Sequence, residues 1–244
     1  MEGRWRADHT RLEAQMTMAK TLEEKNAARE RVREIAADFA DRGDQLGWFD
    51  EVYRQAAGET DTIPWADLEP NRFFKSWAEK NGLRGNGRKA LVVGCGLGDD
   101  ARFLDELGFD VTAFDISPNA IEWAKSVHKD TQIQFEVGDL FQPNRGWLGA
   151  FEFVLEIYTI QPLPMELRSK AIASVASFVA TGGELVVVCR GRDDGEEVGQ
   201  LPYPLSREDL SGFVRDGLVQ LDLIEVLDEV DEERRFIVHY RRPA

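Results

Sequence analysis

The sequence predicts an α/β fold in which a mostly parallel sheet is closed by an antiparallel C-terminal hairpin and preceded by an N-terminal helical extension. Three observations support this prediction. Short apolar runs alternate with helical patterns from residue 89 onward, residues 8–40 are rich in Ala, Glu, Arg and Lys without any Gly or Pro, and two strand-like runs near the end flank an acidic turn. We expect two parts, an N-terminal segment over 1–83 and a core domain over 84–244.

The N-terminal segment combines a helical stretch with a group of aromatic residues. Apolar residues recur every three or four positions across 8–40, which predicts one or two amphipathic helices that end near Gly43. Packing on the core explains this pattern most simply, and a mobile lid or a dimer contact are the alternatives. Trp48, Tyr53 and Trp65 follow in an aromatic cluster that forms either core or the wall of a pocket.

The core domain alternates strands with helices, which predicts successive right-handed βαβ units. Several of its strands are nearly continuous apolar runs, as expected for parallel strands buried on both faces. The candidate strands are 89–94, 110–115, 132–137, 151–157 and 184–190. The candidate helices are 99–107, 118–128, 164–180 and 206–215, and the closing hairpin is 218–230 with 234–241.

The charge balance limits the partners of the protein. The 244 residues carry a formal net charge of −15, and the stretch 191–233 alone has 14 acids and three bases. Nucleic acid and anionic lipid both require a basic surface, so we expect neither nucleic acid nor membrane as a partner and favour a small neutral or cationic ligand. No apolar run approaches the roughly 18 residues of a membrane span, and we expect a cytoplasmic protein. Two cysteines and three scattered histidines predict no metal site.

A glycine-rich turn follows the first strand of the core. Gly94, Gly96 and Gly98 lie two residues apart between a buried strand and a helix that begins with Asp99 and Asp100. Glycine permits a positive φ and a close ligand approach, and the helix start offers free N–H groups, so we expect the edge of a ligand here. The two carboxylates would repel the pyrophosphate of a dinucleotide, and the spacing also differs from that of dinucleotide sites.

Acidic residues end the next two strands. Asp115 ends the second strand, where a carboxylate can accept hydrogen bonds from both ribose hydroxyls of an adenosine. Asp139 and Leu140 follow the third strand and would suit an adenine amino group and ring face. A lone Asp after a strand is usually a cap, but three strand-end features in this order predict a nucleoside site.

These residues resemble the class I S-adenosylmethionine-dependent methyltransferases from Ala90 to about Arg190. The matching motifs are Gly94-Cys95-Gly96-Leu97-Gly98, Asp115, and Gly138-Asp139-Leu140. The resemblance implies a three-layer, Rossmann-like, seven-stranded sheet, with S-adenosylmethionine as cofactor and S-adenosylhomocysteine as product. The implied cofactor-binding residues are Gly94, Gly96, Gly98, Asp115, Ile116, Asp139 and Leu140.

A second resemblance concerns the aromatic segment. Trp48, the Ile63-Pro64-Trp65 turn and Glu156 resemble the thiopurine, thiol and halide methyltransferase branch, in which an N-terminal aromatic segment closes over the cofactor. This resemblance implies that Trp48 and Trp65 contact the cofactor and that Trp48 and Tyr53 contact the acceptor. The chain departs from the branch after the fourth-strand acid, because Ile157 and Tyr158 replace the usual Arg or His.

The end of the fourth strand supplies the candidate catalytic residues. Ligands of open α/β sheets bind beyond the carboxyl ends of the strands, so Glu156, Tyr158 and Gln161 should face the methyl group or the acceptor. Glu156 and Tyr158 are the catalytic candidates, and Tyr158 and Gln161 are acceptor contacts. A buried Glu156 needs a partner, which is the ammonium of the cofactor, an arginine such as Arg190, or a proton of the substrate.

We therefore expect in-line methyl transfer from S-adenosylmethionine to a small-molecule nucleophile: a thiol, a thiopurine-like compound or another S, N or O acceptor. Two alternatives remain. One is a non-catalytic protein that binds S-adenosylmethionine or S-adenosylhomocysteine and uses its N-terminal helices for a regulatory or partner contact. The other is an NAD-dependent oxidoreductase, which the glycine spacing and Asp99 disfavour.

Overall fold

The computed structural model describes residues 24–244. The chain divides into two compact units, with the boundary between Ala66 and Asp67. The sequence-based boundary at 83/84 differs from this division, because helix α3 (Arg72–Lys80) packs on strand β7 (Arg234–Arg241) of the second unit. The part of the expected N-terminal helix before residue 24 lies outside the described residues.

The first unit contains a helix over residues 24–41, helix α2 (Trp48–Ala56) and the short 3-10 helix η1 (Thr60–Thr62). Its aromatic residues contact one another. The Trp65 indole N–H donates to the Tyr53 hydroxyl at 2.8 Å, and the rings of Trp48 and Trp65 meet edge to face with centroids 6.5 Å apart. Trp48 and Tyr53 are buried, whereas Trp65 is 39% exposed. The three residues therefore form one aromatic cluster.

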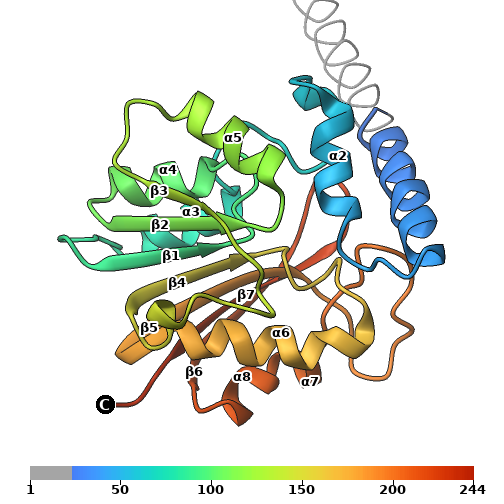
Figure 1. Cartoon of the computed structure of the whole chain (residues 1–244). Coiled ribbons are helices and arrows are strands. Elements are labelled where there is room, and N and C mark those ends of the chain that lie inside the picture. The colour runs from blue at the N-terminus through green and yellow to red at the C-terminus, as the bar shows by residue number, and fades with distance from the viewer. Residues whose placement is uncertain (1–23) are drawn as a thin grey trace, which may run out of the picture. The chain divides into compact units, whose positions relative to one another are not determined.

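The second unit is built on a seven-stranded sheet with the strand order β3-β2-β1-β4-β5-β7-β6 (Figure 1). The first five strands pair in parallel, and β7 pairs antiparallel with both β5 and β6. The strands are β1 (Lys89–Val93), β2 (Asp110–Asp115), β3 (Gln134–Val137), β4 (Phe151–Ile157), β5 (Val179–Arg190), β6 (Val219–Leu227) and β7. The expected mostly parallel sheet with an antiparallel C-terminal hairpin is confirmed.

Helices cover both faces of this sheet. One face carries α3, α4 (Asp99–Glu106) and α5 (Pro118–Val127), and the other carries α6 (Met165–Phe178), α7 (Arg207–Leu210) and α8 (Gly212–Arg215) (Figure 1). The two faces explain why the central strands are apolar throughout: all but the first residue of β1 and of β2 are buried. These layers confirm the three-layer Rossmann-like architecture.

The largest differences from the expected elements concern β5 and the helix before β6, and both have local reasons. Strand β5 begins at Val179 and not at 184, because Val179 pairs with Phe151 across an irregularity in the ladder that the glycine-rich stretch 182–183 concealed. The single helix expected over 206–215 is two helices that meet at Ser211. Neither change alters the sheet order.

Ion pairs hold the closing hairpin to its neighbours. Asp228, which is 5% exposed, pairs with Arg72 at the start of α3 and lies 3.3 Å from the buried Arg235 of β7. Asp231 pairs with the same Arg235 at 2.7 Å and with Arg190 at the end of β5 at 3.7 Å. The acidic excess of 191–233 is thus partly neutralised by arginines within the fold.

Within residues 24–244, no helix has the length and apolar content that a membrane crossing requires.

Candidate active site

The candidate site lies where the order of the strands reverses. The chain moves outward from β1 to β2 and β3, and then returns to place β4 on the other side of β1. The edge beyond the carboxyl ends of β1 and β4 is therefore the topological switch point, where open α/β sheets bind their ligands in a crevice. The glycine turn follows β1 and the predicted catalytic residues follow β4, so the structure brings both groups to this edge.

The glycine turn uses the backbone conformation that the sequence predicts. Gly94, Gly96 and Gly98 all have positive φ, at 60°, 53° and 90°. The Cys95 N–H donates to the Phe114 carbonyl of β2 at 2.9 Å, which ties the turn to the neighbouring strand. Residues with side chains adopt this conformation only under strain, so the turn requires glycine for its backbone shape.

Core side chains leave no space for a Cβ at two of these glycines. A Cβ at Gly94 would overlap the Thr159 side chain, and one at Gly98 would lie 2.7 Å from the Phe135 ring and 3.1 Å from that of His128. The Thr159 hydroxyl also donates to the Val93 carbonyl at 2.9 Å. Protein packing alone therefore requires glycine at these positions, before any ligand is considered.

Asp115 joins three of the strand ends. Its Oδ2 accepts from the Gly96 N–H at 3.0 Å, and its Oδ1 accepts from the Ser117 N–H at 2.9 Å. Its carbonyl accepts from the Gly138 N–H at 2.9 Å, which links β2 to the end of β3. The carboxylate is only 7% exposed, but each oxygen can accept more than one hydrogen bond. Asp115 therefore orders the glycine turn and ties it to the ends of β2 and β3.

The other residues predicted to contact the adenine are Ile116, Asp139 and Leu140, which follow the ends of β2 and β3. Asp139 Oδ1 accepts from the Phe141 N–H at 2.7 Å, which forms a tight turn after β3, and Leu140 is 7% exposed. Ile116 is half-buried between Asp115 and Ser117. These positions follow the ends of β2 and β3, and two of the three side chains are apolar.

Asp99 and Asp100 begin α4, directly after the glycine turn. Asp100 Oδ1 accepts from the Asn71 backbone N–H at 2.7 Å, and Asn71 in turn caps α3 through its own side chain. Burial raises the pKa of Asp100 to about 7 and also raises that of Asp99. Asp100 therefore connects α4 to α3, a contact that the sequence analysis missed because the partners are 29 positions apart along the chain.

Glu156 is fully buried in β4 and is held by backbone. Its Oε1 accepts from the N–H groups of Thr159 and Ile160 at 2.7 and 3.0 Å, whereas its Oε2 has no hydrogen-bond partner among the described residues. Burial raises the pKa of Glu156 to about 7, against the effect of these two donors. The suggested pairing with Arg190 is wrong, because Arg190 pairs with the hairpin acids Asp231 and Glu233.

Tyr158 follows β4 with φ at 57°, which is rare for a residue with a side chain. Its hydroxyl accepts from Arg235 Nε at 3.1 Å. Burial raises the pKa of Tyr158 above that of an ordinary tyrosine, although the Arg235 guanidinium acts in the opposite direction. The phenol is therefore protonated at neutral pH and can donate its own O–H. Backbone strain of this kind concentrates at functional sites.

Gln161 is fully buried and serves the loop after β4. Its Oε1 accepts from the Arg190 N–H at 2.6 Å, and its carbonyl accepts from the Tyr203 N–H at 3.0 Å. Its Nε2 has no hydrogen-bond partner among the described residues. These bonds join the β4 and β5 exits, which is a structural role that the expected acceptor contact did not anticipate.

Three further residues, His128, Thr159 and Arg235, support the glycine turn and Tyr158. His128 Nε2 lies 3.0 Å from the Leu97 carbonyl, and its ring stacks on Phe135 behind the glycine turn. All three residues act across long sequence distances, and no local pattern marks them. Among residues 24–244, no group of three or more His, Cys, Asp or Glu side chains could hold a metal ion.

Comparisons with known proteins agree with this geometry. Residues 90–183 match a protein-family model described as a methyltransferase domain. A UPF0146 protein of Pyrococcus abyssi (strain GE5 / Orsay) is 34% identical over 107 residues, which are 41% of this chain and 76% of that protein.

Solved structures show the same fold at lower identity. A 1,6-didemethyltoxoflavin-N1-methyltransferase of Burkholderia thailandensis, with S-adenosylhomocysteine bound, has a TM-score of 0.63 and 15% identity over 80% of this chain and 86% of that chain. The [4+2]-cyclase SpnF has a TM-score of 0.61 and 17% identity over 71% and 80%. The cyclase illustrates that one fold hosts different reactions, so the residues of the site must support the function. Residues 90–183 therefore form a methyltransferase domain, the chain is a relative of the UPF0146 protein, and its sheet has the fold of the class I S-adenosylmethionine-dependent methyltransferases.

Proposed function

We propose that this protein transfers a methyl group from S-adenosylmethionine to a small-molecule acceptor. The observation that supports this proposal most directly is the hydrogen bond from the Gly96 N–H to the Asp115 carboxylate at the switch point of the sheet. It places a buried carboxylate beside a glycine turn of positive φ. This arrangement suits a nucleoside, because the protein backbone at the glycines can approach the ligand closely.

The residues at the switch point fit the cofactor in chemistry as well as in position. Asp115 would accept from the ribose hydroxyls, Asp139 would accept from the adenine amino group, and Ile116 and Leu140 would contact the ring. Gly94, Gly96 and Gly98 would follow the amino-acid part of the cofactor. The acids at this edge suit a cationic sulfonium better than a pyrophosphate, because Asp99 and Asp100 stand at the start of α4.

One carboxylate oxygen of Glu156 is available to bind the cofactor or the acceptor. One carboxylate oxygen is used by backbone, and the buried Oε2 is available to accept from the cofactor ammonium or from a proton of the acceptor. A buried acceptor without a partner is costly, so such a bond would be favourable. The sulfonium of the cofactor supplies an already activated methyl group. The main tasks of the protein are then to align the nucleophile and to exclude water.

The acceptor side is proposed to include Tyr158 and Gln161, together with the aromatic cluster of the first unit. From the resemblance to the thiopurine, thiol and halide methyltransferases, Trp48 and Trp65 are proposed to contact the cofactor, and Trp48 and Tyr53 to contact the acceptor. An aromatic wall would favour a planar or apolar acceptor and would attract the sulfonium through cation–π contact. Sulfur, nitrogen and oxygen acceptors are all compatible with this arrangement.

Calorimetry tests the cofactor, and turnover tests the reaction. We expect S-adenosylhomocysteine to bind in the micromolar range and NAD not to bind; the reverse result would refute the proposal. Labelled S-adenosylmethionine should then lose its methyl group to at least one member of a panel of thiols, thiopurines, iodide, phenols and amines. Tight cofactor binding without any turnover would favour a non-catalytic binding protein instead.

A further inference from the structure

The loop after β4 and the closing hairpin are joined by a hydrogen bond at Tyr158. Arg235 Nε donates to the Tyr158 hydroxyl at 3.1 Å, and Arg235 is only 4% exposed near the start of β7. A guanidinium has donors but no acceptor, so it can only donate to the phenol oxygen. The hydrogen of the phenol therefore points elsewhere.

The second polar neighbour of the phenol is also a donor. Burial raises the pKa of Tyr158, and a hydrogen bond with the Asn71 side chain lowers it. Asn71 Oδ1 already accepts from the N–H groups of Phe73 and Phe74 at 3.1 Å each, so its NH₂ group is the part that remains for the phenol. Among the described residues the phenol hydrogen thus has no acceptor, and the partly exposed side chain leaves it free to donate to a ligand.

Acids of the hairpin hold the Arg235 guanidinium in place. Its Nη2 donates to Asp231 at 2.7 Å and lies 3.3 Å from Asp228, and its Nη1 lies 3.4 Å from Glu233. With Nε on the phenol, all three nitrogens have a partner. A planar guanidinium held in this way cannot turn away from Tyr158 without losing ion pairs.

We propose that Arg235 is a positioning residue that fixes the Tyr158 phenol for the methyl acceptor. The guanidinium occupies the phenol oxygen, so that the O–H is left to donate to the acceptor. The role rests on the proposed methyl transfer, in which Tyr158 lies on the acceptor side. The positive φ of Tyr158, at 57°, fits this role, because backbone strain is retained where a side chain must be placed. The matching acceptor carries a hydrogen-bond acceptor, such as a ring nitrogen or an oxygen.

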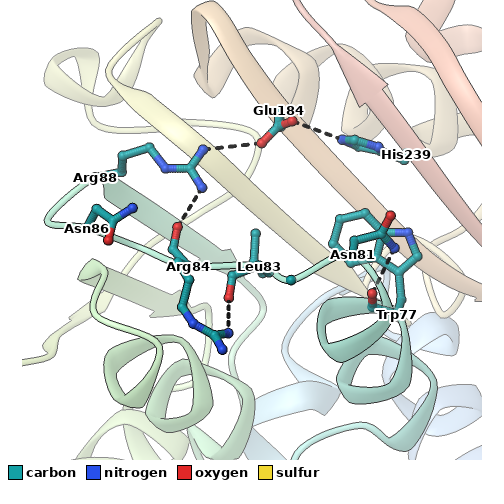
Figure 2. Close-up of a pocket in the computed structure, with 9 residues that line it drawn as sticks. Trp77, Asn81, Leu83, Arg84, Asn86, Arg88, Glu184 and His239 are labelled. Carbon is teal, nitrogen blue, oxygen red and sulfur yellow. Dashed lines mark hydrogen bonds and ion pairs between the residues drawn. The ribbon is translucent and has the colours of Figure 1, made fainter.

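Two other arginines supply matched controls. Arg190 lies opposite Arg235 in the β5–β7 ladder and pairs with two of the same hairpin acids, whereas the bond to Tyr158 comes from Arg235. Arg88 directly precedes β1, at the opposite edge of the sheet from the glycine turn, and its Nη1 lies 3.2 Å from Glu184 Oε2 beside a pocket (Figure 2). In each case a change to lysine keeps the charge but replaces the guanidinium fork by a single nitrogen.

NMR tests the contact without any acceptor. The chain has four tyrosines, so tyrosine labelled with ¹³C at Cζ gives a simple spectrum, in which the Tyr158 signal is identified by its loss in Tyr158→Phe. We expect Arg235→Lys to move this signal and Arg190→Lys and Arg88→Lys to leave it in place. Unchanged binding of S-adenosylhomocysteine checks that the variants are folded. A Tyr158 signal that stays in place in folded Arg235→Lys would overturn the inference.

A double-mutant cycle tests the role in the reaction, with the panel member that the unmodified protein methylates fastest as substrate. We expect Arg235→Lys and Tyr158→Phe each to lower kcat/KM about fivefold or more, which corresponds to about 1 kcal/mol, the size of one hydrogen bond. Arg88→Lys should leave kcat/KM unchanged. In the Tyr158→Phe background, Arg235→Lys should have little further effect.

Tyr158→Phe keeps the ion pairs of the hairpin, so it tests the phenol even where Arg235→Lys loses stability. Full activity of Tyr158→Phe would overturn the inference. An equal loss from Arg235→Lys in both backgrounds would also overturn it, because the arginine would then act on the fold and not through the phenol. Absence of turnover by the unmodified protein would instead refute the methyl transfer itself, on which this role depends.

Discussion

Replacement of Asp115 by asparagine tests the role of the strand-end acid, because it removes the charge with the smallest change in side-chain shape. In the structure both carboxylate oxygens accept from backbone, one from Gly96 and one from Ser117. An asparagine keeps one acceptor oxygen but places an NH₂ group where the second acceptor was. One of the two N–H groups therefore loses its partner, and any ligand hydroxyl loses a charged acceptor.

The structure gives two separate magnitudes. A buried N–H without an acceptor costs about 1–3 kcal/mol, which should appear as a fall in the free energy of unfolding of the ligand-free protein. A hydroxyl that bonds a charged rather than a neutral acceptor gains a further ~1–2 kcal/mol, so S-adenosylhomocysteine should bind the variant roughly 5- to 30-fold more weakly. The two effects have different readouts and can be measured independently.

Chemical denaturation measures the first effect and calorimetry with S-adenosylhomocysteine measures the second. Asp110→Asn is the matched control, because Asp110 is the exposed first residue of the same strand, at the edge opposite the switch point. The control should change neither quantity appreciably. If Asp115→Asn lowers the unfolding free energy but binds the ligand as tightly as the unmodified protein, Asp115 is only a structural clamp and the ribose assignment is refuted.

Three further predictions concern the supports of the site. Gly98→Ala should lower the free energy of unfolding by at least about 2 kcal/mol in chemical denaturation, because φ is 90° and the new Cβ would meet Phe135. Gly149→Ala is the control, because Gly149 also has a positive φ but has open space around it, and this change should lower the unfolding free energy less. Equal losses in the two variants would contradict the packing argument. Glu156 has a pKa raised to about 7, so the folded protein binds its proton more tightly than the unfolded chain, and this group should reduce stability as pH rises from about 4.5 through 7, by up to about 3 kcal/mol. Glu156→Gln should remove that part of the pH dependence of the unfolding free energy, and an unchanged pH profile would show that Glu156 is not the group responsible. Spectrophotometric titration of Tyr158→Phe should lose one phenol that ionises above the ordinary tyrosine range, and loss of a phenol with an ordinary pKa would contradict the burial of Tyr158.

The sheet was predictable from the sequence because its signals are local. Strands β2 and β4 begin and end where the apolar runs do, and the glycine turn and Asp115 stand at strand ends that the pattern already marks. The acid-separated runs at the C-terminus likewise predicted the antiparallel pair β6 and β7. These features depend on short stretches of chain, which a single sequence shows directly.

The supports of the site were not predictable in this way. Thr159 and His128 contact the glycine turn from other elements, and Arg235 reaches Tyr158 across 77 residues of chain. An arginine was one of three partners expected for Glu156, but within the described chain backbone N–H groups three and four residues later bond its Oε1 instead. Such contacts depend on how the layers pack, and neither periodicity nor motif spacing carries that information.

The packing behind the glycine turn has a consequence for protein engineering. Thr159 blocks any side chain at Gly94, and Phe135 and His128 do the same at Gly98, so the turn is shaped by residues that lie behind it. A graft of the five-residue glycine motif onto another sheet would transfer the sequence of the turn without the side chains that pack behind it. A working transplant of this site would have to carry Thr159, Phe135 and His128 with it, and all three lie outside the glycine motif, at least 30 residues further along the chain.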